Sequence, residues 1–195
     1  MNYSILQKLQ NRLCFTVDEL AAAARIRPES ARVLASRYAQ KGIFIRLKNN
    51  LYVLGQKWQN LAQGDFLAIA NRLQVPSYVS FMTALMFYEV TSQVQRGFVE
   101  SASLKRSISF DARDTSFNFY KLKKAYYFGF SRQDNIFIAS KEKAFVDMVY
   151  LYGLGKYRFD ASSLDLKKLD KNLIKDILKT FPAKTGEIAR KLCRI

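Results

Sequence analysis

Apolar residues near the start of the chain recur at helical spacing, with polar residues between them. Residues 2–12 predict a first helix, because Ile5 and Leu9 fall on one stripe of it. The stretch FTVDELAAAA predicts a second helix. It opens with Thr16 and Glu19 at the spacing of a capping box, in which each side chain accepts a hydrogen bond from the other residue's backbone amide. Two helices that are each apolar on one side indicate a small helical core.

A third helix is predicted directly after a break at residues 25–27. Pro28 suits the first turn of a helix, where no amide donor is needed, and Gly42 suits the left-handed position that commonly ends one. Ile26, inside the break, is expected to be a core anchor. The predicted buried stripe of this helix consists of Ala31, Leu34, Ala35 and Tyr38.

Residues 43–54, IFIRLKNNLYVL, alternate in a way that predicts a β-hairpin with Asn49 and Asn50 in a two-residue turn. Strand pairing around that turn would place Ile43, Ile45, Leu47, Tyr52 and Leu54 on one face. The other face would hold Phe44, Arg46, Lys48, Leu51 and Val53. Three helices followed by a basic hairpin form a winged helix-turn-helix, whose third helix enters the DNA major groove.

The candidate DNA-binding residues lie on the third helix, at its start and on the hairpin. Arginine can pair with guanine through two hydrogen bonds, Ser and Gln can read bases or hold phosphates, and a basic hairpin can contact the neighbouring backbone or minor groove. The alternative is a helical protein-interaction domain with a solvated charged face. The candidates are Arg25, Arg27, Ser30, Arg32, Ser36, Arg37, Gln40, Lys41, Arg46, Lys48, Asn49 and Asn50.

The rest of the chain mixes strand and helix patterns. Residues 56–63 predict a connector, and residues 64–195 a second domain. Its β-rich runs, among them GFVESAS, FNFYKL and NIFIA, predict a sheet, and FMTALMFYEV and SKEKAFVDMVYLY predict helices that pack on it. The expected fold class is α+β: a winged helix-turn-helix at residues 1–55, followed by a mixed α/β C-terminal domain with a β-sheet packed by helices.

A basic amphipathic helix is predicted over residues 164–181. Its apolar side would consist of Leu166, Leu169, Leu173, Ile177 and Phe181, and a second side would hold Lys168, Lys171, Lys175 and Lys179. Such a face can bind DNA, a membrane surface or a partner protein, or it can simply be solvated.

Charge is the strongest signal in the composition. The chain has 32 Lys plus Arg against 16 Asp plus Glu, a formal net charge of +16, which favours polyanionic partners. The sequence has no histidine, so Ser-His-Asp, Cys-His and His-based metal chemistry are excluded. Serine-enzyme motifs occur at 116–118, 140–143 and 184–186, but the first, an Asn motif, precedes the nucleophile motif, and the last precedes a helix where a strand is required. We therefore expect no enzyme, catalytic residue, metal or cofactor.

The two cysteines and the first residues indicate the cellular compartment in which the protein is expected. Cys14 and Cys193 are too few and too far apart for a disulfide framework or a zinc site. Residues 1–13 alternate between polar and apolar side chains, unlike a secretory signal, and no run of 18 apolar residues is present. A cytoplasmic protein with no membrane contact is therefore expected.

Several segments together resemble the AbiEi antitoxins of bacterial type IV toxin-antitoxin systems. The resemblance runs through FTVDELAAAARI, LKNNLYVL and VPSYVSFMTALMFYEV, and is most specific at IFIASKEKAFVDMVYL. In that last segment Lys141 replaces the usual proline of the family. Ser140 is expected to cap the helix, and Lys143 and Asp147 are expected to form an exposed ion pair worth a few tenths of a kcal/mol, roughly.

The resemblance implies a cytoplasmic protein with two functions. The winged helix would bind operator DNA and repress its own operon. The C-terminal domain would counteract a cognate AbiEii toxin, a nucleotidyltransferase-like enzyme, with or without direct contact. The possible antitoxin surface consists of Lys168, Lys171, Lys175 and Lys179. An alternative stays open: a winged-helix transcription regulator whose C-terminal domain senses a ligand or an unrelated protein.

Overall fold

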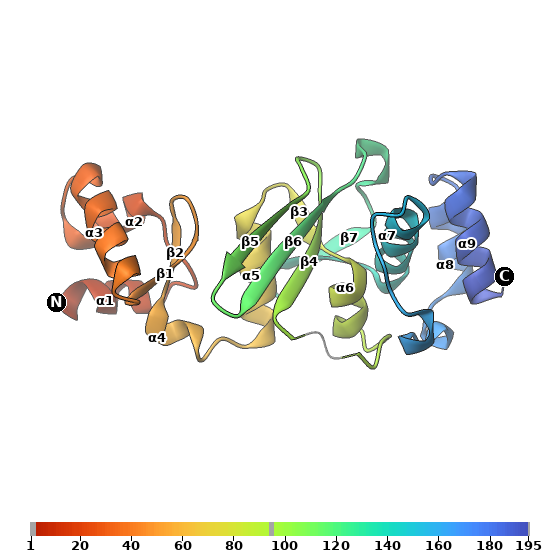
Figure 1. Ribbon diagram of the computed structural model, residues 1–195, viewed down its shortest axis with the longest axis horizontal. Helices are drawn as coiled ribbons and strands as arrows, with labels where there is room; N and C mark the ends of the chain where they lie inside the picture. Colours follow the sequence, from red (N-terminus) through yellow and green to blue (C-terminus); the bar gives the residue numbers. More distant parts are fainter. Residues whose placement is uncertain (1–2, 94–95, 195) are drawn as a thin grey trace.

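The structure of the chain is a computed structural model that describes residues 3–93 and 96–194. A helical N-terminal region lies at one end, a β-sheet occupies the middle, and two helices close the opposite end (Figure 1). The fold is mixed α+β, as predicted. No helix in the described part of the chain is long and apolar enough to cross a membrane.

The N-terminal region has the predicted helices. They are α1 (Tyr3–Gln10), α2 (Val17–Ala24) and α3 (Pro28–Gln40), followed by β1 (Phe44–Lys48) and β2 (Leu51–Leu54). The capping box of Thr16 and Glu19 is present at the start of α2. A hydrophobic cluster formed by all five elements holds them together, with Leu9, Phe15, Leu20, Ala31 and Phe44 almost fully buried in it.

The register of the hairpin differs from the predicted one. Lys48 pairs with Leu51 across the expected turn, but Arg46 pairs with Tyr52, so Leu47 is an extra residue in a β-bulge. One extra residue turns the rest of the strand over. The predicted faces are therefore wrong: Phe44, Tyr52 and Leu54 share the small N-terminal cluster, and Ile45, Leu47, Leu51 and Val53 pack on the opposite side, in the larger cluster of the C-terminal part.

The C-terminal part is built on a six-stranded sheet of order β5-β6-β4-β3-β8-β7. The pairs β4–β6 and β3–β8 are parallel, and the other neighbours are antiparallel. The strands are β3 (Ser77–Val79), β4 (Phe98–Ser103), β5 (Ile108–Ala112), β6 (Thr115–Lys121), β7 (Phe130–Gln133) and β8 (Ile136–Ala139). The helices around it are α5 (Gln63–Leu73), α6 (Phe81–Phe87) and α7 (Lys141–Gly153); α5 packs against β3, β4 and β8, and α7 against α6.

The N-terminal region is docked on the C-terminal part. The hairpin lies between α3 and the sheet, and β1 contacts β5 (Figure 1). Helix α4 (Gly55–Trp58) overlaps the start of the predicted connector and ends in the buried Trp58, whose indole Nε1 donates to Asp114 Oδ1 at 3.1 Å. Since both the hairpin and the connector contribute buried side chains to the larger cluster, the apolar core is continuous across the predicted boundary.

The predicted helix over residues 164–181 is wrong. Two 3₁₀ turns, η2 (Ala161–Ser163) and η3 (Leu166–Lys168), precede α8 (Lys171–Leu178), and α9 (Ala183–Cys193) follows. The carboxylates of Asp165 and Asp170 accept hydrogen bonds from backbone amides, so each starts a new turn and the helical phase changes. Leu173, placed on the apolar stripe, is 50% exposed, whereas Ile174 and Leu178 are buried.

Candidate nucleic-acid interface and buried polar sites

The third helix presents one apolar and one polar face. Ala31 and Ala35 are fully buried, and these small side chains allow α2 and α3 to pack closely. The outer face is solvated, so the helix projects its long polar side chains away from the core. All of the predicted α3 residues are exposed: Ser30, Arg32, Ser36, Arg37 and Gln40, with Lys41 at the C-cap.

Two arginines flank the N-terminal end of α3. Arg25 ends α2 in the left-handed region with φ 55°, and Arg27 is the N-cap of α3. Among the ion pairs of the described residues, none involves Arg25, Arg27, Arg32 or Arg37. Ile26 is 38% exposed between the arginines, so the expectation of a core anchor is wrong. This end of α3 therefore carries cations without a protein counterion.

Some polar residues of the hairpin bond within the hairpin, and others bond to neighbouring helices. Arg46 and Asn49 are exposed, and the guanidinium of Arg46 donates to Asn49 Oδ1 at 3.3 Å. Asn50 instead accepts a hydrogen bond from Val17 N at 2.8 Å and so caps α2. Lys48 is half-buried, and its Nζ donates to Leu73 O at 2.7 Å, at the C-terminal end of α5.

Burial, and next the nearby Lys105, lower the pKa of Lys48. Lys48 and Asn50 thus each make a hydrogen bond to another element of the chain. Arg46, Asn49 and Asn50 are all exposed, but within the described residues the side chains of Arg46 and Asn49 bond only to each other.

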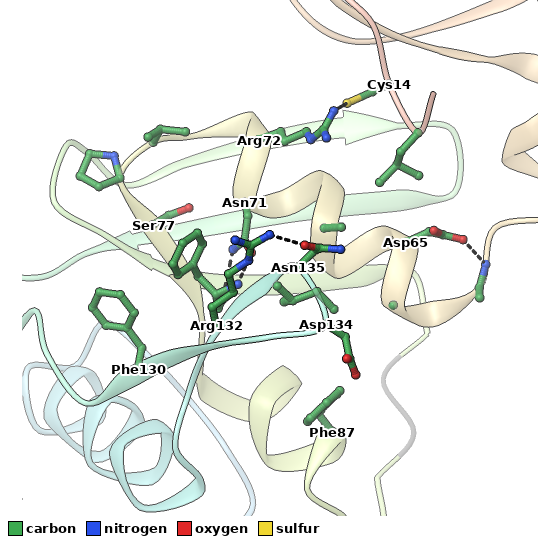
Figure 2. Close-up of a pocket in the computed structure, with 18 of the residues that line it drawn as sticks. Cys14, Asp65, Asn71, Arg72, Ser77, Phe87, Phe130, Arg132, Asp134 and Asn135 are labelled. Atoms are coloured by element: carbon green, nitrogen blue, oxygen red, sulfur yellow. Dashed lines mark hydrogen bonds between the residues drawn. The ribbon is translucent and has the colours of Figure 1, made fainter. Parts of the chain in front are cut away.

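A groove of about 1190 Å³ lies where the N-terminal region meets the C-terminal part (Figure 2). Helix α5, the β7–β8 hairpin and residues 11–14 form its walls. Three of its apolar residues, Val75, Phe87 and Phe137, are exposed, by 60%, 39% and 43%. Arg72 donates to Cys14 Sγ at 3.4 Å across the junction, and Arg132 donates to Asn135. The groove combines aromatic surface with three arginines, of which Arg12 is paired with Glu19.

The pair of Lys143 and Asp147 is fully buried, with both side chains 0% exposed. The expectation of an exposed pair is wrong, because α7 packs between the sheet, α6, α8 and α9 and has no solvated face at these positions. Besides Lys143, two groups bond to Asp147: the Tyr78 hydroxyl and Ser80 Oγ each donate to Oδ2 at 2.9 Å.

Aromatic rings enclose the ammonium group of Lys143. It lies 5.4, 5.1 and 5.3 Å from the ring centroids of Tyr78, Phe128 and Phe181, and Nζ donates to the Tyr78 hydroxyl at 2.9 Å. Burial lowers the pKa of Lys143 and raises the pKa of Asp147, whereas their mutual attraction opposes both changes. Such cation–π contacts and hydrogen bonds compensate the desolvation of the ion pair.

Glu100 on β4 is a second buried carboxyl group. The Tyr157 hydroxyl donates to Oε2 at 2.7 Å, and the backbone amides of Met82 and Thr83 also bond to the group. Burial raises the pKa of Glu100 to about 7. Because its carboxylate accepts hydrogen bonds from backbone amides in the first turn of α6, Glu100 caps the N-terminus of that helix from strand β4.

The burial of Lys143 and Asp147 could have been predicted from the composition of their helix, although their i,i+4 spacing alone indicated an exposed pair. After Lys141 and Glu142 at its start, helix α7 is apolar all round apart from Lys143 and Asp147, and a helix of that kind is buried. A Lys and an Asp inside it must therefore pair away from water. Glu100, by contrast, lies in a strand whose neighbours alone bury it. Within the described ranges, no three Cys, Asp or Glu side chains gather as a metal site.

Comparison with protein-family models and with curated proteins finds no match to the chain. The fold is similar to the crystal structure of the RV2827C protein from Mycobacterium tuberculosis, with a TM-score of 0.65 over 97% of this chain and 74% of that one. The two sequences are 9% identical, so the similarity concerns the fold alone.

Proposed function

We propose that this protein binds double-stranded operator DNA through α3 and represses transcription of its own operon. One observation carries the proposal: the exposed face of α3 and the turn before it hold four arginines that have no ion-pair partner among the described residues. Phosphates would supply the missing counterions. The net charge of +16 supports the same class of partner.

The salt dependence of duplex binding tests this proposal. If the protein neutralises about 6 to 10 phosphates, its affinity falls by roughly 10³ to 10⁵ between 50 and 200 mM salt. Gel shifts with the protein's own promoter and with a shuffled duplex measure both the salt slope and the selectivity. Weak, salt-independent binding to both duplexes would contradict the proposal.

We further propose that the protein is an antitoxin that antagonises a nucleotidyltransferase-like toxin in the cytoplasm. The AbiEi resemblance supports this function, and it centres on the segment from β8 into α7. A candidate surface for antagonism is the exposed lysine set of α8 and its C-cap, Lys171, Lys175 and Lys179. Lys168 lies in η3, and its Nζ donates to Glu89 O at 2.7 Å, so it belongs to a different surface element.

A toxicity-rescue assay with full-length variants separates the two functions. Cutting the chain at residue 55 would expose Ile45, Leu47 and Val53, so truncation would confuse folding with function. Arg32→Ala with Arg37→Ala is expected to abolish repression and preserve rescue. Reversing the charge of the three α8 lysines to glutamate is expected to weaken rescue and preserve repression. Loss of both activities in each variant would contradict the division of functions.

The groove favours a second candidate function, a regulator that senses a ligand. Because its walls come from both parts of the chain, an occupant would change how the winged helix is held. Aromatic walls beside Arg72 and Arg132 fit an aromatic carboxylate. Benzoate-type probes that raise Tm and shift duplex affinity would support this function. Phe137→Arg, which fills the groove, should remove both effects.

A further inference from the structure

The exposed surface of α3 has a central line of residues, and the arginines Arg32 and Arg37 lie outside that line. At about 100° per residue, Glu29, Val33, Ser36 and Gln40 follow one another along the side opposite the buried alanines. Arg32 and Arg37 lie about 70° to either side of that line. When such a helix enters a major groove, its central line faces the base edges and its flanks face the two phosphate strands.

This arrangement assigns base contacts to side chains other than the arginines. Val33 is the apolar member of the central line, and it is 53% exposed. It belongs to neither hydrophobic cluster of the described residues, and its neighbours on the line are all polar. The apolar group that the major groove offers is the 5-methyl group of thymine.

We infer that Val33 reads a thymine 5-methyl group in the DNA target, and that Arg32 and Arg37 hold the flanking phosphates. The inference rests on the proposed DNA binding and adds the base type that α3 selects. Val33 lies in the second turn of α3, near the end that reaches base edges in this motif. The target should therefore contain a thymine opposite that turn.

Replacing thymine by uracil removes only the methyl group, so it tests the contact directly. The probe is the tightest duplex that the full-length protein selects from a random-sequence pool, with each thymine changed singly to deoxyuridine. One or two positions should weaken binding about fourfold, which corresponds to about 0.8 kcal/mol for a buried methyl-sized group. Val33→Ala should bind the thymine and uracil forms of those positions equally.

Matched variants keep the test specific. Leu173→Ala removes an apolar side chain of similar exposure on α8 and should leave the fourfold ratio unchanged. Ser36→Ala, on the same line of α3, should change affinity without changing that ratio. Val33→Ala should fold normally, because the side chain is 53% exposed and belongs to neither hydrophobic cluster of the described residues.

The possible outcomes distinguish failure of the Val33 assignment from failure of the proposed DNA binding. Failure to select any preferred duplex would refute the proposed DNA binding itself. A preferred duplex without a Val33-dependent uracil effect, or one with no thymine opposite α3, would overturn the role of Val33 and leave DNA binding standing. Loss of selectivity in Arg32→Ala, with Val33→Ala unaffected, would reverse the assignment of the two side chains.

Discussion

Replacing Asp147 with asparagine tests how strongly the fold depends on the buried ion pair of α7. The amide has the shape of the carboxylate and can still accept hydrogen bonds from Tyr78 and Ser80, at the present 2.9 Å. It cannot neutralise Lys143, whose ammonium group would stay fully buried among three aromatic rings. The substitution therefore leaves one charge uncompensated, and it also turns the amide NH2 group toward the ammonium that now donates to Oδ1.

The expected cost follows from that burial. Removing one partner of a buried pair lowers the free energy of unfolding by about 3 to 5 kcal/mol. The pair of Asp176 and Lys179 on α8 is the matched control, because its side chains are 64% and 77% exposed. Asp176→Asn should cost at most about 0.5 kcal/mol. With a urea m-value of about 2 kcal/mol/M, the two variants should differ by roughly 2 M in transition midpoint.

Urea titrations followed by far-UV circular dichroism measure both costs. If Asp147→Asn leaves too little stability to observe a transition, the double variant Lys143→Met with Asp147→Leu should recover it, because an apolar pair of similar volume removes both charges. Equal midpoints for Asp147→Asn and Asp176→Asn would refute the reasoning. A double variant less stable than Asp147→Asn would do the same.

Three further predictions concern Glu100, Lys48 and Gly129. The pKa of Glu100 is raised from 4.5 to about 7, so the native state binds more protons than the unfolded chain in that window. The free energy of unfolding should fall as pH rises from about 4.5 to about 7, and Glu100→Gln should flatten this slope in urea titrations at pH 5 and 8. Lys48→Met should lower the free energy of unfolding by about 1 to 2 kcal/mol, since it loses bonds to the end of α5. In gel shifts it should leave duplex affinity unchanged, whereas weaker binding to every duplex would place Lys48 on a phosphate. Gly129 and Gly155 both have φ +70°, but only at Gly129 would an added Cβ meet another side chain, at 3.0 Å from Lys143 Cγ. Gly129→Ala should therefore lower the melting temperature more than Gly155→Ala, and equal losses would mean that backbone strain alone acts.

Local interactions made the helices of the N-terminal region predictable. The capping box of α2, the proline at the start of α3 and the apolar stripes all depend on residues within one or two helical turns of each other. The same stripes determine which face of α3 is solvated, so exposed positions such as Arg32 and Ser36 could be named from the sequence. Long β-rich runs likewise predicted a sheet, without its strand order.

Tertiary packing decided the features that the sequence patterns missed. A bulge at Leu47 turned the hairpin over, because its second apolar face is buried against the C-terminal part. Asp170 restarted the helix near the C-terminus, where side-chain capping competes with a continuous stripe. Lys143 and Asp147 have the same i,i+4 spacing as an exposed pair. Spacing alone does not specify the solvent around a side chain, and here α6, α8, α9 and the sheet exclude water from both side chains.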